Sequence, residues 1–177
     1  MNDKGSPYFI IFPLWLLVFA ASSQVMIIAP ILPKIGLELQ TSESLLGNLI
    51  TVYATMLGIS AILIGPLSDK IGRRKILLLG SSGMSVFLLL HGIANTFLSL
   101  ILLRAAAGMA GGVLSGAAVS YVGDYFPYEK RGWANGWIMS GIAMGQILGI
   151  PLGSFLADEF GFKFPFMLFG MIMGITR

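Results

Sequence analysis

The charged side chains of this sequence occur in two settings, and each suggests a different chemistry. Most gather in short segments, the densest of which is Asp69–Lys75 within GPLSDKIGRRK at positions 65–75. Arg104 instead stands alone inside the apolar stretch 97–123. Such a charge costs about 2.5 kcal/mol or more to insert into hydrocarbon, so it normally faces a cavity or a partner. Arg104 is therefore a candidate binding or coupling residue, unless it extends outward to the lipid headgroups.

Enzyme chemistry finds little support in the sequence. There is no cysteine and one histidine, and every aspartate and glutamate lies in a predicted loop or at a helix end. A catalytic pair or a metal site needs such groups close together, so we expect neither an enzyme nor a bound cofactor or metal. We expect His91, near the outer end of an apolar stretch, at the membrane interface. The net charge of +3 is confined to loops, which argues against a nucleic-acid partner.

Long apolar stretches must position these residues. Crossing a bilayer takes about 20 apolar residues. Five stretches are long enough, at residues 8–33, 45–67, 76–95, 97–123 and 133–157, and the first is too long for a signal-peptide core of about 7–15 residues. A sixth, within 164–177, is incomplete because its apolar part ends at Ile175. We therefore expect an all-α polytopic protein of the cell membrane, and a fragment that ends inside its sixth helix.

Basic residues fall mainly on one side of the predicted membrane. If the N-terminus is cytoplasmic, the inner segments hold Lys4, Lys70, Arg73, Arg74, Lys75, Lys130, Arg131 and Arg177. The outer loops then hold Lys34 and Lys163. Because lysine and arginine are enriched in cytoplasmic loops, the sequence predicts a cytoplasmic N-terminus.

The two halves of the chain share one spacing. Asp69-x-x-Gly72 and Asp158-x-x-Gly161 lie 89 residues apart, and the same offset relates Tyr8 to Phe97 at the starts of two apolar stretches. Each unit would hold three helices, an odd number, so the second unit would lie upside down relative to the first. Inverted repeats of this kind build many secondary transporters. Chance similarity between helices joined by short loops is the alternative.

The segment GPLSDKIGRRK has features that a simple topology signal does not need. The pair Gly65–Pro66 is expected to end the second helix, because proline lacks a donor and glycine lacks a side chain. Gly72 is expected in a tight turn. Asp69 is expected to precede the third helix, where it would accept from free N–H groups or pair with Arg73 or Arg131.

This segment resembles the signature loop of the major facilitator superfamily, G-x-L-a-D-r-x-G-r-k-x-x-l. The matching positions are Gly65, Leu67, Asp69, Lys70, Gly72, Arg73, Arg74 and Leu77. Three other segments resemble further motifs of the family. They are Ala29–Pro33 (P-x-x-P), Arg104 with Gly108 (R-x-x-q-G, one residue longer here) and Asp124–Gly132 (D-x-x-P-x-E-x-R-G), which includes Glu129 and Arg131. The resemblance implies a six-helix N-terminal bundle of 3+3 inverted repeats, with a second, C-terminal bundle missing from this chain.

The resemblance also implies roles for individual residues. Arg104 would couple transport to protons. Since no predicted span holds a carboxylate, the acid that titrates would be Asp124, at the inner end of the fourth helix, or a residue of the missing bundle. The signature loop, with Glu129 and Arg131, would form a cytoplasmic gate in which Asp69 latches the cytoplasmic side, partly against the second bundle.

The fifth stretch carries a glycine at every fourth position. These glycines are Gly141, Gly145, Gly149 and Gly153. Small residues at this spacing let a neighbouring helix backbone come close. Together with Gly136 and Pro151, they also resemble the antiporter signature of drug-efflux members, although Pro151 comes one residue late and Ser154 replaces the last glycine.

Uncharged polar side chains are candidates for a substrate path, although helix packing would explain each of them equally well. The candidates are Gln24, Asn48, Tyr53, Asn135 and Gln146. Met26, Met56 and Met139 would suit a pliant apolar pocket. We expect a secondary transporter that exports small organic molecules in exchange for protons by alternating access. A sugar or metabolite symporter or uniporter of the same fold, a dimerising half-transporter, a channel and a membrane scaffold are the alternatives.

Overall fold

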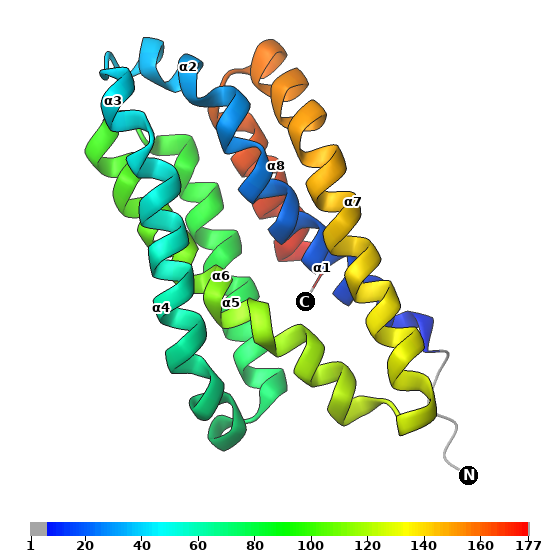
Figure 1. Ribbon diagram of the computed structural model, residues 1–177. Helices are drawn as coiled ribbons and strands as arrows, with labels where there is room; N and C mark the ends of the chain where they lie inside the picture. Colours follow the sequence, from blue (N-terminus) through cyan, green and yellow to red (C-terminus); the bar gives the residue numbers. More distant parts are fainter. Residues whose placement is uncertain (1–6, 177) are drawn as a thin grey trace.

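The structure is a computed structural model that describes residues 7–176, except for the side chains of Asp69, Ser115, Gly116 and Val119. The predictions for Lys4 and Arg177 lie outside the described residues. The described part consists of helices and their connections, without a strand (Figure 1). In chain order the elements are α1 (Tyr8–Met26), α2 (Ile28–Glu38), α3 (Glu43–Leu46), α4 (Asn48–Ile71), α5 (Arg73–Leu90), the 3-10 turn η1 (His91–Ile93), α6 (Phe97–Tyr125), α7 (Tyr128–Phe160) and α8 (Lys163–Ile175).

Five helical segments of the described chain are long and apolar enough to cross a membrane. They are Tyr8–Met26, Glu43–Ser68, Arg73–Ile93, Phe97–Leu114 and Tyr128–Phe160. Helix α8 is apolar but shorter. The predicted all-α architecture with several apolar spans is confirmed.

The first predicted helix, 8–33, ends in the wrong place. The structure divides it at Ile27 into α1 and α2, and α2 continues past Pro33 to Glu38. The break precedes Pro30, which has no N–H to donate to the carbonyl of Met26 and whose ring crowds that carbonyl. Pro33 does not stop α2 because a proline disturbs the turn before it rather than the residues after it.

The expected end of the second helix at Gly65–Pro66 is also wrong. Helix α4 runs through both residues to Ile71 and ends at Gly72, whose φ of 102° only glycine adopts readily. Apolar membrane helices tolerate an internal proline because neighbouring groups satisfy the freed carbonyl. Asp69 therefore lies in the last turn of α4 rather than in a loop before α5.

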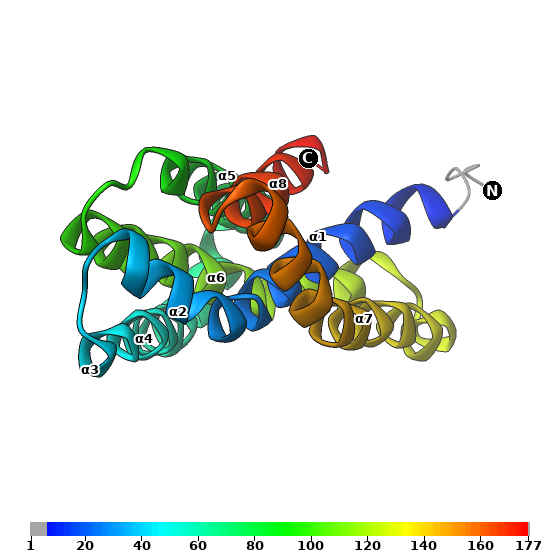
Figure 2. The same ribbon diagram turned by 90° about the horizontal axis from the view of Figure 1, so that it is seen from above.

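The helices form three layers. Helices α1 and α6 lie in the centre, α4 and α7 cover one side, and α5 and α8 cover the other (Figure 2). The most extensive contacts join α4 to α6, α1 to α7, α5 to α6 and α5 to α8. The buried core runs through these contacts and is mainly aliphatic and aromatic, but it also includes buried polar side chains such as Gln24 and Arg104.

The packing is reciprocal between the two halves of the chain. The first helix of each half packs on the second helix of the other, because α1 contacts α7 and α6 contacts α4. The offset of 89 residues maps the contact of Ser23 with Gly149 onto the contact of Gly112 with Ser60. Gly72 and Gly161, separated by the same offset, are the glycines with positive φ in the described chain. A two-fold relation between two three-helix units produces this pattern.

Candidate functional site

Arg104 lies in α6 with 1% of its surface exposed. Its Nη1 donates to Oε1 of Gln24 at 3.3 Å. Its Cζ lies 4.4 Å from the ring centroid of Phe166 in α8 and 5.7 Å from that of Tyr53 in α4. Its Nε and Nη2 have no hydrogen-bond partner among the described residues. This burial excludes the alternative in which Arg104 extends to the lipid headgroups.

Gln24 connects three helices at this point. From α1, its Nε2 donates to the hydroxyl of Tyr53 in α4 at 2.7 Å, while its Oε1 accepts from Arg104 in α6. Gln24 and Tyr53 are also buried. Leaving a buried polar group unpaired costs about 1–3 kcal/mol, so this amide holds Tyr53 and Arg104 in a defined orientation.

Glycines of α6 make room for Tyr53. A Cβ atom at Gly108 would lie 2.4 Å from the carbonyl oxygen of Tyr53, and one at Gly111 would lie 2.7 Å from its hydroxyl. A Cβ at Gly112 would lie 2.3 Å from the carbonyl oxygen of Leu57. Side chains at these positions would push α4 away from α6, so the glycines place Tyr53 beside Arg104.

The glycine face of α7 packs against α1. Gly141, Gly145, Gly149 and Gly153 are all buried. A Cβ at Gly145 would lie 2.5 Å from the carbonyl oxygen of Phe19, and one at Gly149 would lie 2.8 Å from that of Ser23. Gly136 meets open space and Pro151 is exposed. The fourfold spacing thus serves close backbone packing.

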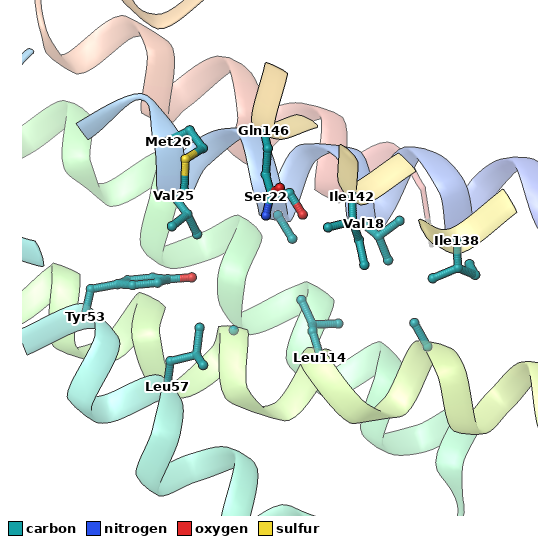
Figure 3. A pocket seen from close by; sticks show the side chains of 13 residues that line it. Val18, Ser22, Val25, Met26, Tyr53, Leu57, Leu114, Ile138, Ile142 and Gln146 are labelled. Atoms are coloured by element: carbon teal, nitrogen blue, oxygen red, sulfur yellow. The ribbon is translucent and has the colours of Figure 1, made fainter. Parts of the chain in front are cut away.

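A pocket of about 210 Å³ lies between the α1–α7 pair and the α4–α6 pair. In Figure 3 the ring of Tyr53 lies across one end with its hydroxyl pointing inward, and Ser22 and Gln146 enter from the α1–α7 side. Leu57 and Leu114 lie on the opposite side. None of the described residues that line the pocket is charged. Such a pocket suits an apolar molecule with a few hydrogen-bonding groups.

Three residues singled out in the sequence line this pocket, namely Tyr53, Gln146 and Met26. Gln24 does not line it but lies behind Tyr53 through their hydrogen bond. Because Gln146 directly follows a glycine that packs on α1, the glycine face also sets the position of this polar side chain.

The other sequence candidates lie elsewhere. Asn48 is exposed at the start of α4. Asn135 lies near the start of α7, and its buried Oδ1 has no partner among the described residues. Neither of them, nor Met56 or Met139, lines the pocket. Their place in a substrate path stays a prediction.

Comparison with known proteins decides the family, because residues 14–176 match the family model described as Major Facilitator Superfamily. The chain belongs to the Major Facilitator Superfamily. The resemblance seen in the signature loop is thereby confirmed. With its several apolar spans, this member of the superfamily is a multi-pass membrane protein.

Its relatives include proteins named for drug resistance. The chain is 34% identical to the uncharacterized MFS-type transporter YwfA of Bacillus subtilis (strain 168) over 152 residues. These aligned residues are 86% of this chain and 37% of YwfA. It is 30% identical over 166 residues to the multidrug resistance protein MdtG of Klebsiella pneumoniae (strain 342), covering 91% and 40% of the two chains. For MdtG of Proteus mirabilis (strain HI4320) the identity is 31% over 166 residues, covering 91% and 41%. The chain spans about two-fifths of the length of these relatives.

The superfamily signature loop joins α4 to α5. Just after the turn at Gly72, Nε of Arg73 forms an ion pair with Oδ2 of Asp124 at the end of α6, at 2.9 Å. Lys70 and Arg74 are exposed, and Gly65 meets open space. The side chain of Asp69 lies outside the described residues, so its expected partners stay predictions.

The second motif segment closes the same end of the bundle. Nε of Arg131 donates to the carbonyl oxygen of Phe126 at 3.1 Å. Phe126 lies just past the end of α6. Glu129 is exposed in the first turn of α7. Arg131 therefore serves the connection between α6 and α7, while Arg73 and Asp124 connect the two motif segments.

The opposite end of the bundle has polar contacts of its own. Lys34 of α2 forms an ion pair with Asp158 of α7. Lys163, at the start of α8, donates to Oδ1 of Asn95 at 2.6 Å. Asp158 belongs to the repeated Asp-x-x-Gly motif, so the motif contributes an ion pair to this end of the bundle.

Sequence reasoning missed Phe166, whose ring lies close to both Arg104 and His91. The His91 ring is 4.8 Å from it, and Nδ1 of His91 is 2.7 Å from the carbonyl oxygen of Phe87. His91 is fully buried by the turn η1 and the packing of α8, and its expected position at the membrane interface stays a prediction. Phe162, Phe166 and Phe169, all buried, have the helical spacing that would have revealed this face of α8.

Proposed function

We propose that this chain is the N-terminal bundle of a carrier that exports small organic molecules in exchange for protons. The observation that carries the proposal is the apolar pocket next to a buried arginine, with Tyr53 and Gln24 between them. The family membership supports a carrier, and the names of the MdtG relatives support drug-like substrates.

The pocket favours apolar cargo over sugars. Tyr53, Ser22 and Gln146 supply its polar side-chain groups, and the remaining described residues around it are aliphatic, methionine or glycine. A sugar carries many hydroxyl groups that each need a partner when buried. A sugar symporter or uniporter is therefore the less favoured alternative.

Transport would follow from alternating access around this pocket. A second bundle would close the open side between the α1–α7 and α4–α6 pairs, and rocking of one bundle against the other would expose the pocket to each side in turn. The N-terminus and the signature loop would face the cytoplasm, as the distribution of basic residues favours. The ion pair of Arg73 with Asp124 and the carboxylate of Asp69 would stabilise the closed cytoplasmic side.

Proton coupling would require an acid that responds to Arg104. Asp124 is the nearest candidate by motif, yet it pairs with Arg73 at the end of α6 rather than with Arg104. The titrating group is then Asp124 at the gate or an acid contributed by the second bundle. In either arrangement the charge of Arg104 sets the electrostatic field in the centre of the bundle.

A hybrid carrier tests the proposal. Residues 14–176 would replace the matching segment of MdtG from Proteus mirabilis, and proton-driven accumulation of a fluorescent organic probe would be measured in inverted membrane vesicles. We expect saturable accumulation that collapses with the proton gradient, and none from the 177-residue chain reconstituted alone.

Two results would redirect the proposal. Saturable exchange by the 177-residue chain alone would favour a dimerising half-transporter. Saturable uptake that ignores the proton gradient, in a hybrid that inserts normally, would favour a uniporter.

A further inference from the structure

Only part of the hydrogen-bonding capacity of the Arg104 guanidinium is satisfied by the described residues. Nη1 donates to Gln24, whereas Nε and Nη2 are buried without a hydrogen-bond partner among the described residues. The ion pairs identified in the described chain, Lys34 with Asp158 and Arg73 with Asp124, lie at the two ends of the bundle and not at Arg104. A buried charge without a counter-charge is energetically costly. Arg104 is therefore suited to bind a negatively charged group that the described residues of its own bundle do not supply.

The two unused groups form one edge of the guanidinium. Nε–H and Nη2–H point in parallel from the same side of the planar group, and this edge can hold both oxygens of a carboxylate at once. The atom that Gln24 occupies, Nη1, does not belong to this edge. The amide thus fixes the arginine, while the two N–H groups of its carboxylate-binding edge stay buried and unpaired among the described residues.

A hollow next to Arg104 gives a ligand a place to reach it. It measures about 160 Å³ and is lined by Arg104 together with residues of α1, α2 and α4. Arg104 is the charged residue of this lining. Ile50 and Ala54 are exposed at its rim, so the hollow opens at the surface of α4.

The hollow and the main pocket share a wall. Val25, Tyr53 and Leu57 line both, and the ring of Tyr53 lies between them. A molecule in the main pocket is therefore separated from Arg104 by the ring of Tyr53, whereas a molecule in the hollow lies against Arg104. No described residue of either lining is acidic, so a cationic ligand would find no counter-charge there.

Resting on the proposed function, we propose that the preferred substrates are apolar organic acids. Their carboxylate binds the Nε–Nη2 edge of Arg104, and their apolar part lies in the hollow, against its aliphatic side chains and the ring of Tyr53. Tyr53, held by Gln24, forms the wall between the hollow and the main pocket. The site selects anions over isosteric neutral molecules and selects against apolar cations.

Three matched probes test the charge preference without any mutation. Binding of 1-naphthoate, 1-naphthamide and 1-naphthylmethylamine to the purified 177-residue chain in lipid nanodiscs would be measured by calorimetry at pH 7. We expect naphthoate to bind about tenfold or more tightly than the amide, the scale of a charge-assisted hydrogen-bonded pair, and the amine to bind most weakly. Equal binding of the acid and the amide, or no binding of naphthoate, would overturn the proposal.

Variants then locate the preference. Arg104→Gln should reduce the ratio of acid to amide affinity to about one, and Arg104→Lys should retain only part of it because lysine lacks the planar fork. Lys34→Gln, which removes a cation at the end of the bundle, is the matched control and should leave the ratio unchanged. Circular dichroism verifies that each variant is folded, and a ratio that survives Arg104→Gln would place the anion elsewhere and refute the assignment.

Transport by the hybrid carrier separates this inference from the proposed function. If the hybrid exports naphthamide as well as naphthoate in a proton-dependent way, the proposed function holds and the substrate class is wrong. If the hybrid exports neither probe while the chain still prefers naphthoate in nanodiscs, the carboxylate site holds and the efflux proposal is wrong.

Discussion

The two glycine-packed helix pairs, α1–α7 and α4–α6, are related by the repeat but differ in their chemistry. In both, glycines of one helix lie against the backbone of the other, with Gly145 on Phe19 and Gly112 on Leu57. The contact between α4 and α6 also holds the buried charge of Arg104 beside Tyr53. The contact between α1 and α7 includes no buried charge among the described residues.

This difference shows that the repeat copies the packing but not the site. The offset of 89 residues relates Arg104 to Trp15, an uncharged residue of α1. Close packing needs only small residues at regular spacing, so it is the same in both halves. A binding site needs particular side chains on one side of the two-fold relation, and here that side is α6.

The largest expected effect tests the shared packing. Gly145→Leu and Gly112→Leu should each destabilise the chain by about 3 kcal/mol, because the new side chain meets backbone atoms rather than flexible neighbours. Titration with sodium dodecyl sulfate, followed by circular dichroism, measures the loss. Gly136→Leu and Gly58→Leu are matched controls, since a Cβ at either position meets open space. Equal losses in controls and interface variants would mean that the glycine faces do not determine the packing.

Substitution of Arg104 should separate stability from function. Arg104→Met removes a buried charge with two unpaired nitrogen atoms, so the free energy of unfolding should rise by about 1 kcal/mol or more. Proton-driven export by the hybrid carrier should be lost in Arg104→Met and in Arg104→Ala, and Arg104→Lys should restore it in part. A variant that loses stability but keeps export would show that Arg104 is a structural residue.

Tyr53→Phe should have a smaller effect. It removes the hydroxyl that accepts from Gln24 and leaves the ring in place, so the chain should lose about 1 kcal/mol of stability. Affinity for 1-naphthoate should fall because Gln24 no longer holds Arg104 firmly. The matched change on the other side of the comparison, Trp15→Phe, removes the bond from Nε1 of Trp15 to the hydroxyl of Ser140 and should leave that affinity unchanged. An equal loss of affinity in both variants would contradict the special role of Tyr53.

The smallest effect is expected at the end of the bundle. Asp124→Asn breaks the ion pair with Arg73, but both side chains are partly exposed, so the stability change should stay within about 0.5 kcal/mol. Export by the hybrid should fall if Asp124 acts in the gate or the proton path. Lys163→Gln, which removes a polar contact at the opposite end, is the control. Unchanged export in Asp124→Asn would assign the proton-carrying acid to the second bundle.

Periodic features of the sequence predicted much of this architecture. Apolar length identified the spans, and the four-residue spacing of glycines in α7 identified a face that packs on another backbone. The glycines of α6 were harder to interpret, because Gly108, Gly111 and Gly112 lack a regular spacing. Their role in close packing is evident only from their contacts with Tyr53 and Leu57 of α4. The helix ends that were predicted from the prolines were wrong, because α2 continues through Pro33 and α4 continues through Pro66. A membrane helix can do so when other groups bond to the freed carbonyls.

The site itself was predictable only in part. A lone arginine in an apolar stretch identified Arg104, and the polar residues Gln24 and Tyr53 were named without their connection to it. That connection depends on three helices that are distant in sequence, so no local pattern contains it. Phe166 was missed because the helical spacing of Phe162, Phe166 and Phe169 indicates a packed face but does not identify Arg104 as the partner across the helix interface.

We expect the first span to bend most easily near Ile27, between α1 and α2. Pro30 leaves the carbonyl of Met26, a residue of the pocket, without the usual helical donor, so bending costs less there than elsewhere in the span. Beyond this point, α2 is tied to the far end of α7 by Lys34 and Asp158. We therefore expect α2 and the far end of α7 to stay together if the first span bends at this point.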